Sequence, residues 1–164
     1  MAVFYLETSA LLKRYRAERG TELLDELFNS KRDYEILTTS YFTSLEVTSV
    51  ATRLLKGETI TKRSYQLLLG HLSYDMRQLV ILQPISDFIL SKALNLIMDH
   101  TLRAPDAIQL ATACMLKSTI VGQPLYFICA DSKLRGACAD SDLTVLNPES
   151  PDSVKTLKTL RSTL

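Results

Sequence analysis

The chain has 164 residues, of which 46% are hydrophobic and 23% charged, a composition typical of one domain with a core of its own. The formal net charge is +1, which excludes a strongly basic nucleic-acid binder and leaves only a local basic surface. We expect neither a signal peptide nor a membrane span, since no apolar run approaches roughly 18 residues.

The first half of the chain predicts strands and helices in turn. An apolar strand is predicted at residues 3–6, and Leu11, Leu12 and Tyr15 lead into the helix that follows it. A second helix has its apolar residues at positions 23–28. A second strand at residues 35–39 precedes a helix over residues 45–55, which we expect to end at Gly57, a common helix stop. Another helix is predicted at residues 61–72.

The second half continues the pattern. A strand at residues 79–83 leads to a helix at residues 86–98, which begins at a Ser86 cap. Pro105 opens the next helix as a first-turn proline. A strand at residues 125–129, a short helix at 132–139, a strand at 143–146 and a terminal helix at 153–160 follow.

Strands that alternate with helices predict a parallel sheet with helices on both faces. The strands at residues 3–6 and 125–129 are almost continuously apolar, as central parallel strands are. We expect one domain over residues 1–148 and a C-terminal tail over residues 149–164, in which a short helix is predicted.

The three cysteines, Cys114, Cys129 and Cys138, are scattered and lack C-x-x-C spacing. An odd, scattered set argues against a disulfide framework and against a zinc site. Each lies in an apolar stretch, which favours a small buried side chain. This usage is typical of a reducing compartment, so we expect a cytoplasmic protein.

Four acidic residues occupy positions that this sheet would bring together. Glu7 directly follows the first strand, and Asp131 follows the fourth. Glu46 lies in the helix after the second strand, and Asp106 lies in the first turn of the helix opened by Pro105. Sites in open α/β sheets form outside the carboxyl ends of the strands, so we expect the four carboxylates to share one site.

Carboxylates that lie close together need protons or a cation to offset their repulsion. Two of them about 4–5 Å apart repel by roughly 3–4 kcal/mol at an effective dielectric near 20, so several in one pocket share protons or bind a cation. Oxygen ligands alone suit Mg²⁺ or Mn²⁺ rather than zinc. Such an ion activates water and stabilises charge on a phosphate.

Each acid also has a local interpretation. Glu7 could be favoured by the helix that follows it, and Asp131 could cap the helix at residues 132–139. Asp106 could be a first-turn residue, and Glu46 could pair with Arg53. Taken one at a time, these interpretations are at least as good as the functional one. Together they would require four acids to meet at one sheet edge by accident.

The chain resembles PIN-domain proteins, specifically the VapC-type toxins of toxin–antitoxin pairs, from about residue 3 to residue 148. The segments that carry the resemblance are YLETSALLKRY at residues 5–15, SLEV at 44–47, LRAPDAIQLATA at 102–113, CADSKL at 129–134 and VLNP at 145–148. The specificity lies in their order and spacing rather than in any one of them.

The resemblance implies a three-layer α/β/α fold with a five-stranded parallel sheet, a Mg²⁺ or Mn²⁺ site, and endonucleolytic cleavage of RNA. The acidic positions of the family map onto Glu7, Glu46, Asp106 and Asp131. Glu7, Asp106 and Asp131 would hold the metal, and Thr8 or Ser9 would supply the hydroxyl that supports the first acid. An antitoxin that blocks the site and a homodimer are also implied.

RNA must be held by cations near the acids. The candidates are Lys13 and Arg14 near the first acid, Arg103 beside Asp106, and Lys133 beside Asp131, with Arg16 and Arg135 as further possibilities. Lys13 and Arg14 could instead be a solvated helix face, and Arg103 could simply neutralise the acids.

Two positions depart from the family pattern. Glu7 stands where the first acid is normally Asp, and Cys129 stands where a Thr often precedes the fourth acid. The main alternative is therefore a catalytically weakened PIN-like module that acts by binding protein or RNA. A DNA nuclease and another carboxylate–metal enzyme, such as a phosphatase, are further alternatives.

Overall fold

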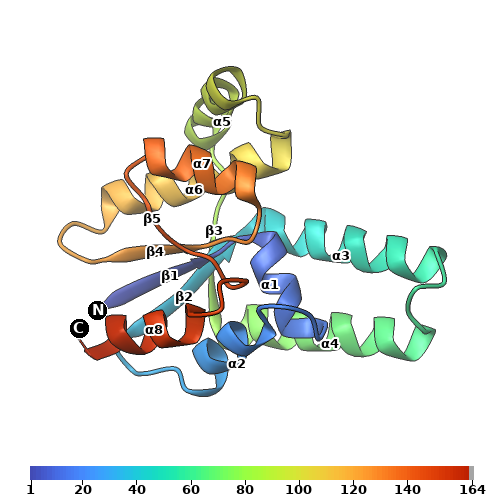
Figure 1. Cartoon of the computed structure of the whole chain (residues 1–164). Coiled ribbons are helices and arrows are strands. Elements are labelled where there is room, and N and C mark those ends of the chain that lie inside the picture. Colours follow the sequence, from blue (N-terminus) through green and yellow to red (C-terminus); the bar gives the residue numbers. More distant parts are fainter. Residues whose placement is uncertain (163–164) are drawn as a thin grey trace.

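Five parallel strands form one sheet with helices on both faces, as Figure 1 shows for the computed structural model, which describes residues 1–162. The strands run in the order β3-β2-β1-β4-β5. Their bounds are β1 Ala2–Leu6, β2 Glu35–Ser40, β3 Val80–Gln83, β4 Leu125–Ile128 and β5 Thr144–Leu146. The predicted three-layer α/β/α fold with a five-stranded parallel sheet is confirmed.

The helices begin and end close to the predicted positions. Their bounds are α1 Thr8–Tyr15, α2 Thr21–Asn29, α3 Tyr41–Lys56, α4 Lys62–Gln78, α5 Asp87–His100, α6 Ala104–Thr119, α7 Ser132–Asp140 and α8 Ser153–Ser162. Side-chain caps explain several of the starts: Ser40 caps α3, Thr61 caps α4, and Ser86 caps α5. Gly57 ends α3, as predicted.

Helix α4 is the clearest difference from the sequence expectation, since it runs on to Gln78 instead of ending near residue 72. Leu68, Leu72 and Met76 are buried at helical spacing, so the apolar stripe continues through the extra turns. Gly70 does not interrupt the helix. A β-carbon there would meet nothing, and the residue lies on the exposed side.

The two faces of the sheet carry separate apolar cores. In β1, Phe4 and Leu6 pack with residues of α1, α2, α3, α4 and α8, whereas Val3 and Tyr5 pack with residues of α5, α6 and α7. All five residues of β1 are buried. A strand covered on both faces needs no polar alternation, which explains its continuous apolar sequence.

The C-terminal tail forms the predicted helix, α8, and this helix packs against the body of the protein. Leu157 lies in the first core. The guanidinium of Arg161 makes a bidentate pair with Glu35 at 2.7 and 2.9 Å and reaches Glu26 at 2.8 Å. These contacts tie the tail to the start of β2. The division of the chain at residue 148 stays a prediction.

The cysteines are packed as small side chains. Cys129 and Cys138 are buried, Cys114 is half-buried, and all three thiols are free. Burial raises the pKa of the Cys138 thiol to about 12. No helix within residues 1–162 has both the length and the apolarity to cross a membrane.

Candidate active site

The carboxyl edge of the sheet holds a cavity of about 490 Å³, and all four predicted acids line it. Strands β1 and β4 are neighbours whose last residues, Leu6 and Ile128, are paired. Glu7 and Asp131 therefore follow adjacent strand ends. Glu46 enters from α3 and Asp106 from α6. The fold thus brings these residues together from segments far apart in the sequence.

Glu7 is the most buried of the four acids, with 3% of its surface exposed. It is the N-cap of α1, and its Oε2 accepts hydrogen bonds from the backbone N–H of Ser9 at 2.9 Å and from the Ser9 hydroxyl. Burial raises its pKa to about 7; the Ser9 hydrogen bonds oppose this, and the charges of Glu46 and Asp106 add to it. Near neutral pH this carboxyl is therefore divided between its protonated and ionised forms.

The other three acids also have nearby donors. Asp131 caps α7 by accepting from the Leu134 N–H at 2.8 Å, and Asp106 accepts from Arg103 Nε at 3.0 Å. Glu46 Oε2 accepts from Thr8 Oγ1 at 2.6 Å and from Gln109 Nε2 at 2.7 Å.

Within residues 1–162, these hydrogen bonds involve only one oxygen of each of the four carboxylates. The local interpretations of Glu7, Asp106 and Asp131 are therefore compatible with convergence on one cavity. Glu46 does not pair with Arg53, whose guanidinium donates to Ser49. The second oxygen of each acid accepts no side-chain or capping hydrogen bond from the part of the chain that the structure describes.

The two hydroxyls predicted to support the first acid, those of Thr8 and Ser9, donate to different acids. Ser9 supports Glu7, as the resemblance implies, but Thr8 donates to Glu46. The Cys129 thiol contacts the backbone of Asp131 and so does not take the place of the threonine hydroxyl that the family pattern often has near the fourth acid. Its Sγ lies 3.6 Å from the backbone oxygen of Asp131, so the carboxylate of Asp131 is held by the start of α7 instead.

The cationic candidates fall into two groups. The Arg103 side chain is 79% exposed at the cavity, and its hydrogen bond to Asp106 raises its pKa. Lys133 is also exposed, and its Nζ donates to the Thr101 carbonyl at 2.6 Å. Both side chains are accessible to a phosphate.

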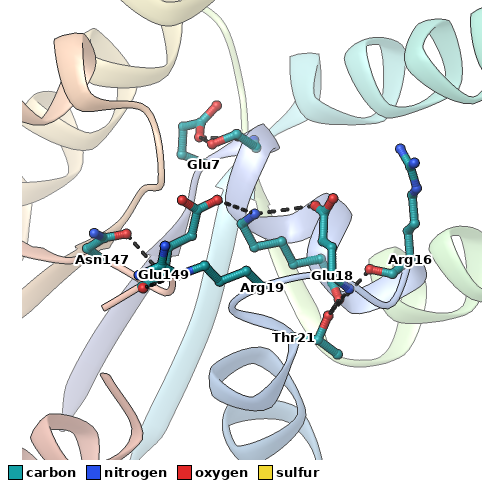
Figure 2. A network of polar contacts seen from close by, with 9 residues as sticks. Glu7, Arg16, Glu18, Arg19, Thr21, Asn147 and Glu149 are labelled. Carbon is teal, nitrogen blue, oxygen red and sulfur yellow. Dashed lines mark hydrogen bonds and ion pairs between the residues drawn. The ribbon is translucent and has the colours of Figure 1, made fainter. Parts of the chain in front are cut away.

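Lys13 and Arg14, in contrast, are held within the protein. The Lys13 ammonium is buried and joins Glu149, at 2.7 Å, to Glu18, at 3.3 Å. Figure 2 shows both glutamates in one network of polar contacts. Arg14 pairs with Asp25 at 3.0 Å and lies over the ring of Phe28. Their role as RNA contacts stays a prediction, and the geometry favours Arg103 and Lys133.

Sequence reasoning missed two parts of the site. Gln109 is fully buried on α6 and hydrogen-bonds Glu46. Its signal was one polar residue in the segment Ala107-Ile108-Gln109-Leu110-Ala111. The cavity also has an apolar wall formed by Leu12, Phe42, Leu45 and Val50. Apolar residues that line a cavity have the same helical spacing as core residues, so the sequence carried no distinct signal for this wall.

Comparison with known families identifies this architecture. The family model for the PIN domain matches residues 4–123, from β1 to the end of α6 and the turn that follows. The chain belongs to the PIN domain family. The matched part includes Glu7, Glu46 and Asp106, while Asp131 lies beyond it. No curated protein matches the chain.

Solved structures share the fold of this PIN domain. FitAcB from Neisseria gonorrhoeae is 19% identical with a TM-score of 0.61, covering 88% of this chain and 97% of that one. A toxin–antitoxin complex from Klebsiella pneumoniae is 21% identical with a TM-score of 0.56, covering 90% and 98%. VapBC-1 from nontypeable Haemophilus influenzae is 12% identical with a TM-score of 0.61, covering 90% and 99%. At these identities the likeness shows the fold.

Proposed function

We propose that this PIN-domain protein is a divalent-metal-dependent endoribonuclease and the toxin of a toxin–antitoxin pair. The observation that carries the proposal is the convergence of Glu7, Glu46, Asp106 and Asp131 on one cavity at the carboxyl edge of the sheet. The structures that share the fold include a toxin–antitoxin complex, which supports the toxin role.

The donor set fits Mg²⁺ or Mn²⁺ in kind, because it consists of carboxylate oxygens and includes no thiolate or imidazole. The raised pKa of Glu7 reflects burial beside other acids, a situation that a cation relieves. As the side chains stand, no group of three or more acidic, histidine or cysteine residues within residues 1–162 is arranged to hold an ion. Glu7, Asp106 and Asp131 would therefore move toward the ion and hold it, directly or through waters.

A bound ion would lower the pKa of a water and stabilise charge on the phosphate. The side chains of the protein supply the positioning. Glu46, held by Thr8 and Gln109, would bind the ion or orient the water that attacks phosphorus in line. Arg103, at the mouth of the cavity, binds a phosphate of the strand.

The first experiment incubates the purified protein with an RNA pool and a matched DNA pool, in Mg²⁺, in Mn²⁺ and in chelator. We expect RNA cleavage only with metal, and Asp106→Asn should lower the rate on the order of 100-fold. Asp99→Asn, which changes an exposed carboxylate on α5, is the matched control and should keep the parent rate. The proposal would be contradicted if RNA stays intact with both metals, or if Asp106→Asn cleaves at the parent rate. Cleavage of DNA alone would favour the DNA nuclease.

A second candidate function is a PIN module that has lost its metal chemistry and acts by binding. Glu7 favours it, because this longer side chain stands where the pattern that the chain resembles has aspartate. A thermal melt with increasing Mn²⁺ separates the two candidates. An intact site gains about 2.7 kcal/mol at 100 times the dissociation constant, whereas a site that binds no ion keeps its melting temperature.

The proposal extends to protein partners, namely an antitoxin and a second copy of the chain. Several large apolar side chains are exposed on the helices: Leu45 on α3, Leu67 on α4, and Phe88, Leu94 and Met98 on α5. Light scattering tests the homodimer, and Leu94→Lys with Met98→Lys should produce a monomer if α5 lies in the interface. Val121→Lys, at a loop position that is 89% exposed, is the control.

A further inference from the structure

Gln109 lies at the centre of a buried hydrogen-bond network beside the acids. It is fully buried on α6, one helical turn after Asp106. The Tyr5 hydroxyl donates to its Oε1 at 2.8 Å. Its Nε2 lies 2.7 Å from Glu46 Oε2, 2.8 Å from Thr8 Oγ1 and 2.9 Å from Thr43 Oγ1. The amide therefore contacts residues of β1, α1 and α3 at once. Its two N–H groups serve three acceptors, of which Glu46 Oε2 and Thr8 Oγ1, only 2.6 Å apart, share one.

The direction of each hydrogen bond in this network can be deduced. The Leu6 carbonyl can only accept, so the Thr39 hydroxyl donates to it, at 2.6 Å. In the contact between Thr39 and Thr43, at 2.7 Å, Thr43 must then be the donor. The Thr43 oxygen is left to accept from Gln109.

The same reasoning applies on the other side of the amide. The Thr8 hydroxyl donates to Glu46, so its oxygen accepts from Gln109. The Tyr5 hydroxyl donates to Gln109 Oε1. One donor faces the amide oxygen and acceptors face the amide nitrogen, so the Gln109 amide has a single allowed orientation.

This arrangement fixes one of the acids. Glu46 Oε2 receives hydrogen bonds from Gln109 and from Thr8, while Glu46 lines the cavity. Two donors on one oxygen set the plane of the carboxylate and leave Oε1 for a ligand. The two donors are not independent, because the Gln109 N–H that reaches Glu46 is shared with the Thr8 oxygen that supports Glu46. Loss of Gln109 would therefore loosen both.

We propose that Gln109 is a positioning residue of the active site, which acts through Glu46 by holding its carboxylate in the orientation that serves the metal and the attacking water. The inference rests on the proposed nuclease function. It adds a residue that touches neither substrate nor ion and sets the geometry of one that does.

The experiment measures the Mn²⁺ dissociation constant of the full chain from the electron paramagnetic resonance signal of free Mn²⁺. Four proteins form a cycle: the parent, Gln109→Met, Glu46→Gln and the double variant. Gln109→Met should raise the dissociation constant about 10-fold, the usual effect of losing a residue that orients a ligand. In the Glu46→Gln background it should have no further effect, because the residue through which it acts has already been changed.

Gln83→Met is the matched control. Gln83 Nε2 donates to the Thr38 hydroxyl at 2.8 Å on the neighbouring strand, so this variant also loses a glutamine–threonine hydrogen bond. It should lower the melting temperature while keeping the parent Mn²⁺ affinity. Tyr5→Phe is the milder second variant. It removes the hydroxyl that orients the amide, does not touch Glu46, and should also weaken Mn²⁺ binding.

Two results would overturn the proposal. One is a Gln109→Met variant with the parent Mn²⁺ affinity. The other is an equal loss of affinity in the Glu46→Gln background, which would mean that Gln109 acts by general packing. A parent protein that binds Mn²⁺ but cleaves no RNA contradicts the proposed function alone, since the affinity cycle still decides the role of Gln109. A parent that binds no Mn²⁺ contradicts both.

Discussion

Glu7 combines a structural role and a proposed chemical role in one carboxyl group. It caps α1 through Ser9 and contributes to the cavity. The side chain is one methylene longer than that of aspartate, the usual first acid in the pattern that the chain resembles. Aspartate can make the same kind of cap, as Asp131 does at the start of α7, so the extra length changes where the carboxylate lies in the cavity and is not needed for the cap.

Glu7→Asp is expected to tighten Mn²⁺ binding. Aspartate is a preferred N-cap, so α1 keeps its start, and the carboxylate moves by about 1.5 Å, one carbon–carbon bond length. Calorimetric titration of parent and variant with Mn²⁺ measures the effect. Glu22→Asp, at an exposed position on α2, is the control for the same substitution. Weaker binding in Glu7→Asp would show that glutamate is the better ligand in this cavity, and unchanged binding would show that the length of this side chain does not limit metal affinity.

The pKa of Glu7 predicts a pH dependence of stability. Its pKa is about 7 in the folded protein against 4.5 for an unperturbed glutamate, so the folded state holds the proton more tightly. The stabilisation is complete below pH 4.5 and is lost as the pH rises through 7. Relative to Glu7→Gln, the free energy of unfolding of the parent should fall by about 3 kcal/mol over this range.

Urea unfolding of both proteins in chelator, at a series of pH values, measures this difference. Added Mn²⁺ should reverse the loss at high pH, because the ion favours the ionised carboxylate. If the difference between parent and variant stays constant with pH, then Glu7 titrates in its ordinary range and the cavity is more hydrated than its burial indicates.

The sequence predicted the acids but not their partners. Glu7 and Asp131 follow strand ends, and a parallel sheet aligns those ends, so their convergence follows from topology. The hydrogen bond from Gln109 to Glu46 joins residues 63 positions apart. No local spacing encodes such a contact, which depends on how α3 and α6 pack. The roles of the acids in chemistry stay predictions.

At the scale of elements, the strands and most helix starts were predictable because each carries a local signal. Buried strands such as β1 and β4 are short apolar runs, and α3, α4 and α5 begin at hydroxyl caps. The end of α4 was not predictable. No glycine or proline marks the end of the helix near Gln78. The helix extends this far because Met76 is buried against residues far away in the sequence.

Arg161→Met tests how α8 is attached. The guanidinium is buried between Glu35 and Glu26, and its removal leaves Glu35 as an uncompensated buried charge. We expect a loss of about 3–5 kcal/mol in the free energy of unfolding, measured by urea denaturation. Adding Glu35→Met should recover most of this loss, since an apolar pair can replace a buried ion pair. Lys158→Met, at an exposed position on α8, should change little. A small loss for Arg161→Met would mean that α8 detaches independently.

At the scale of the whole molecule, the weak net charge means that the proposed RNA binding depends on a few side chains. Arg103→Ala should reduce the slope of log affinity against log salt by about 1, the effect of losing one phosphate contact. Lys13→Met should leave the slope unchanged and lower the melting temperature, since Lys13 joins Glu18 and Glu149. Fluorescence anisotropy with labelled RNA in chelator measures both. The opposite pattern would place Lys13 on the RNA path.

The hydrogen bonds of the acids limit what the presence of the same acids in a related protein says about its activity. Glu7 and Asp131 start helices, and Glu46 anchors a buried amide. A relative without nuclease activity would still be under pressure to keep these residues for folding. An intact acidic signature can therefore outlast the chemistry that it is used to diagnose. For the same reason, alanine at these positions would confuse unfolding with inactivity, and the amides, which keep an acceptor oxygen, separate the two.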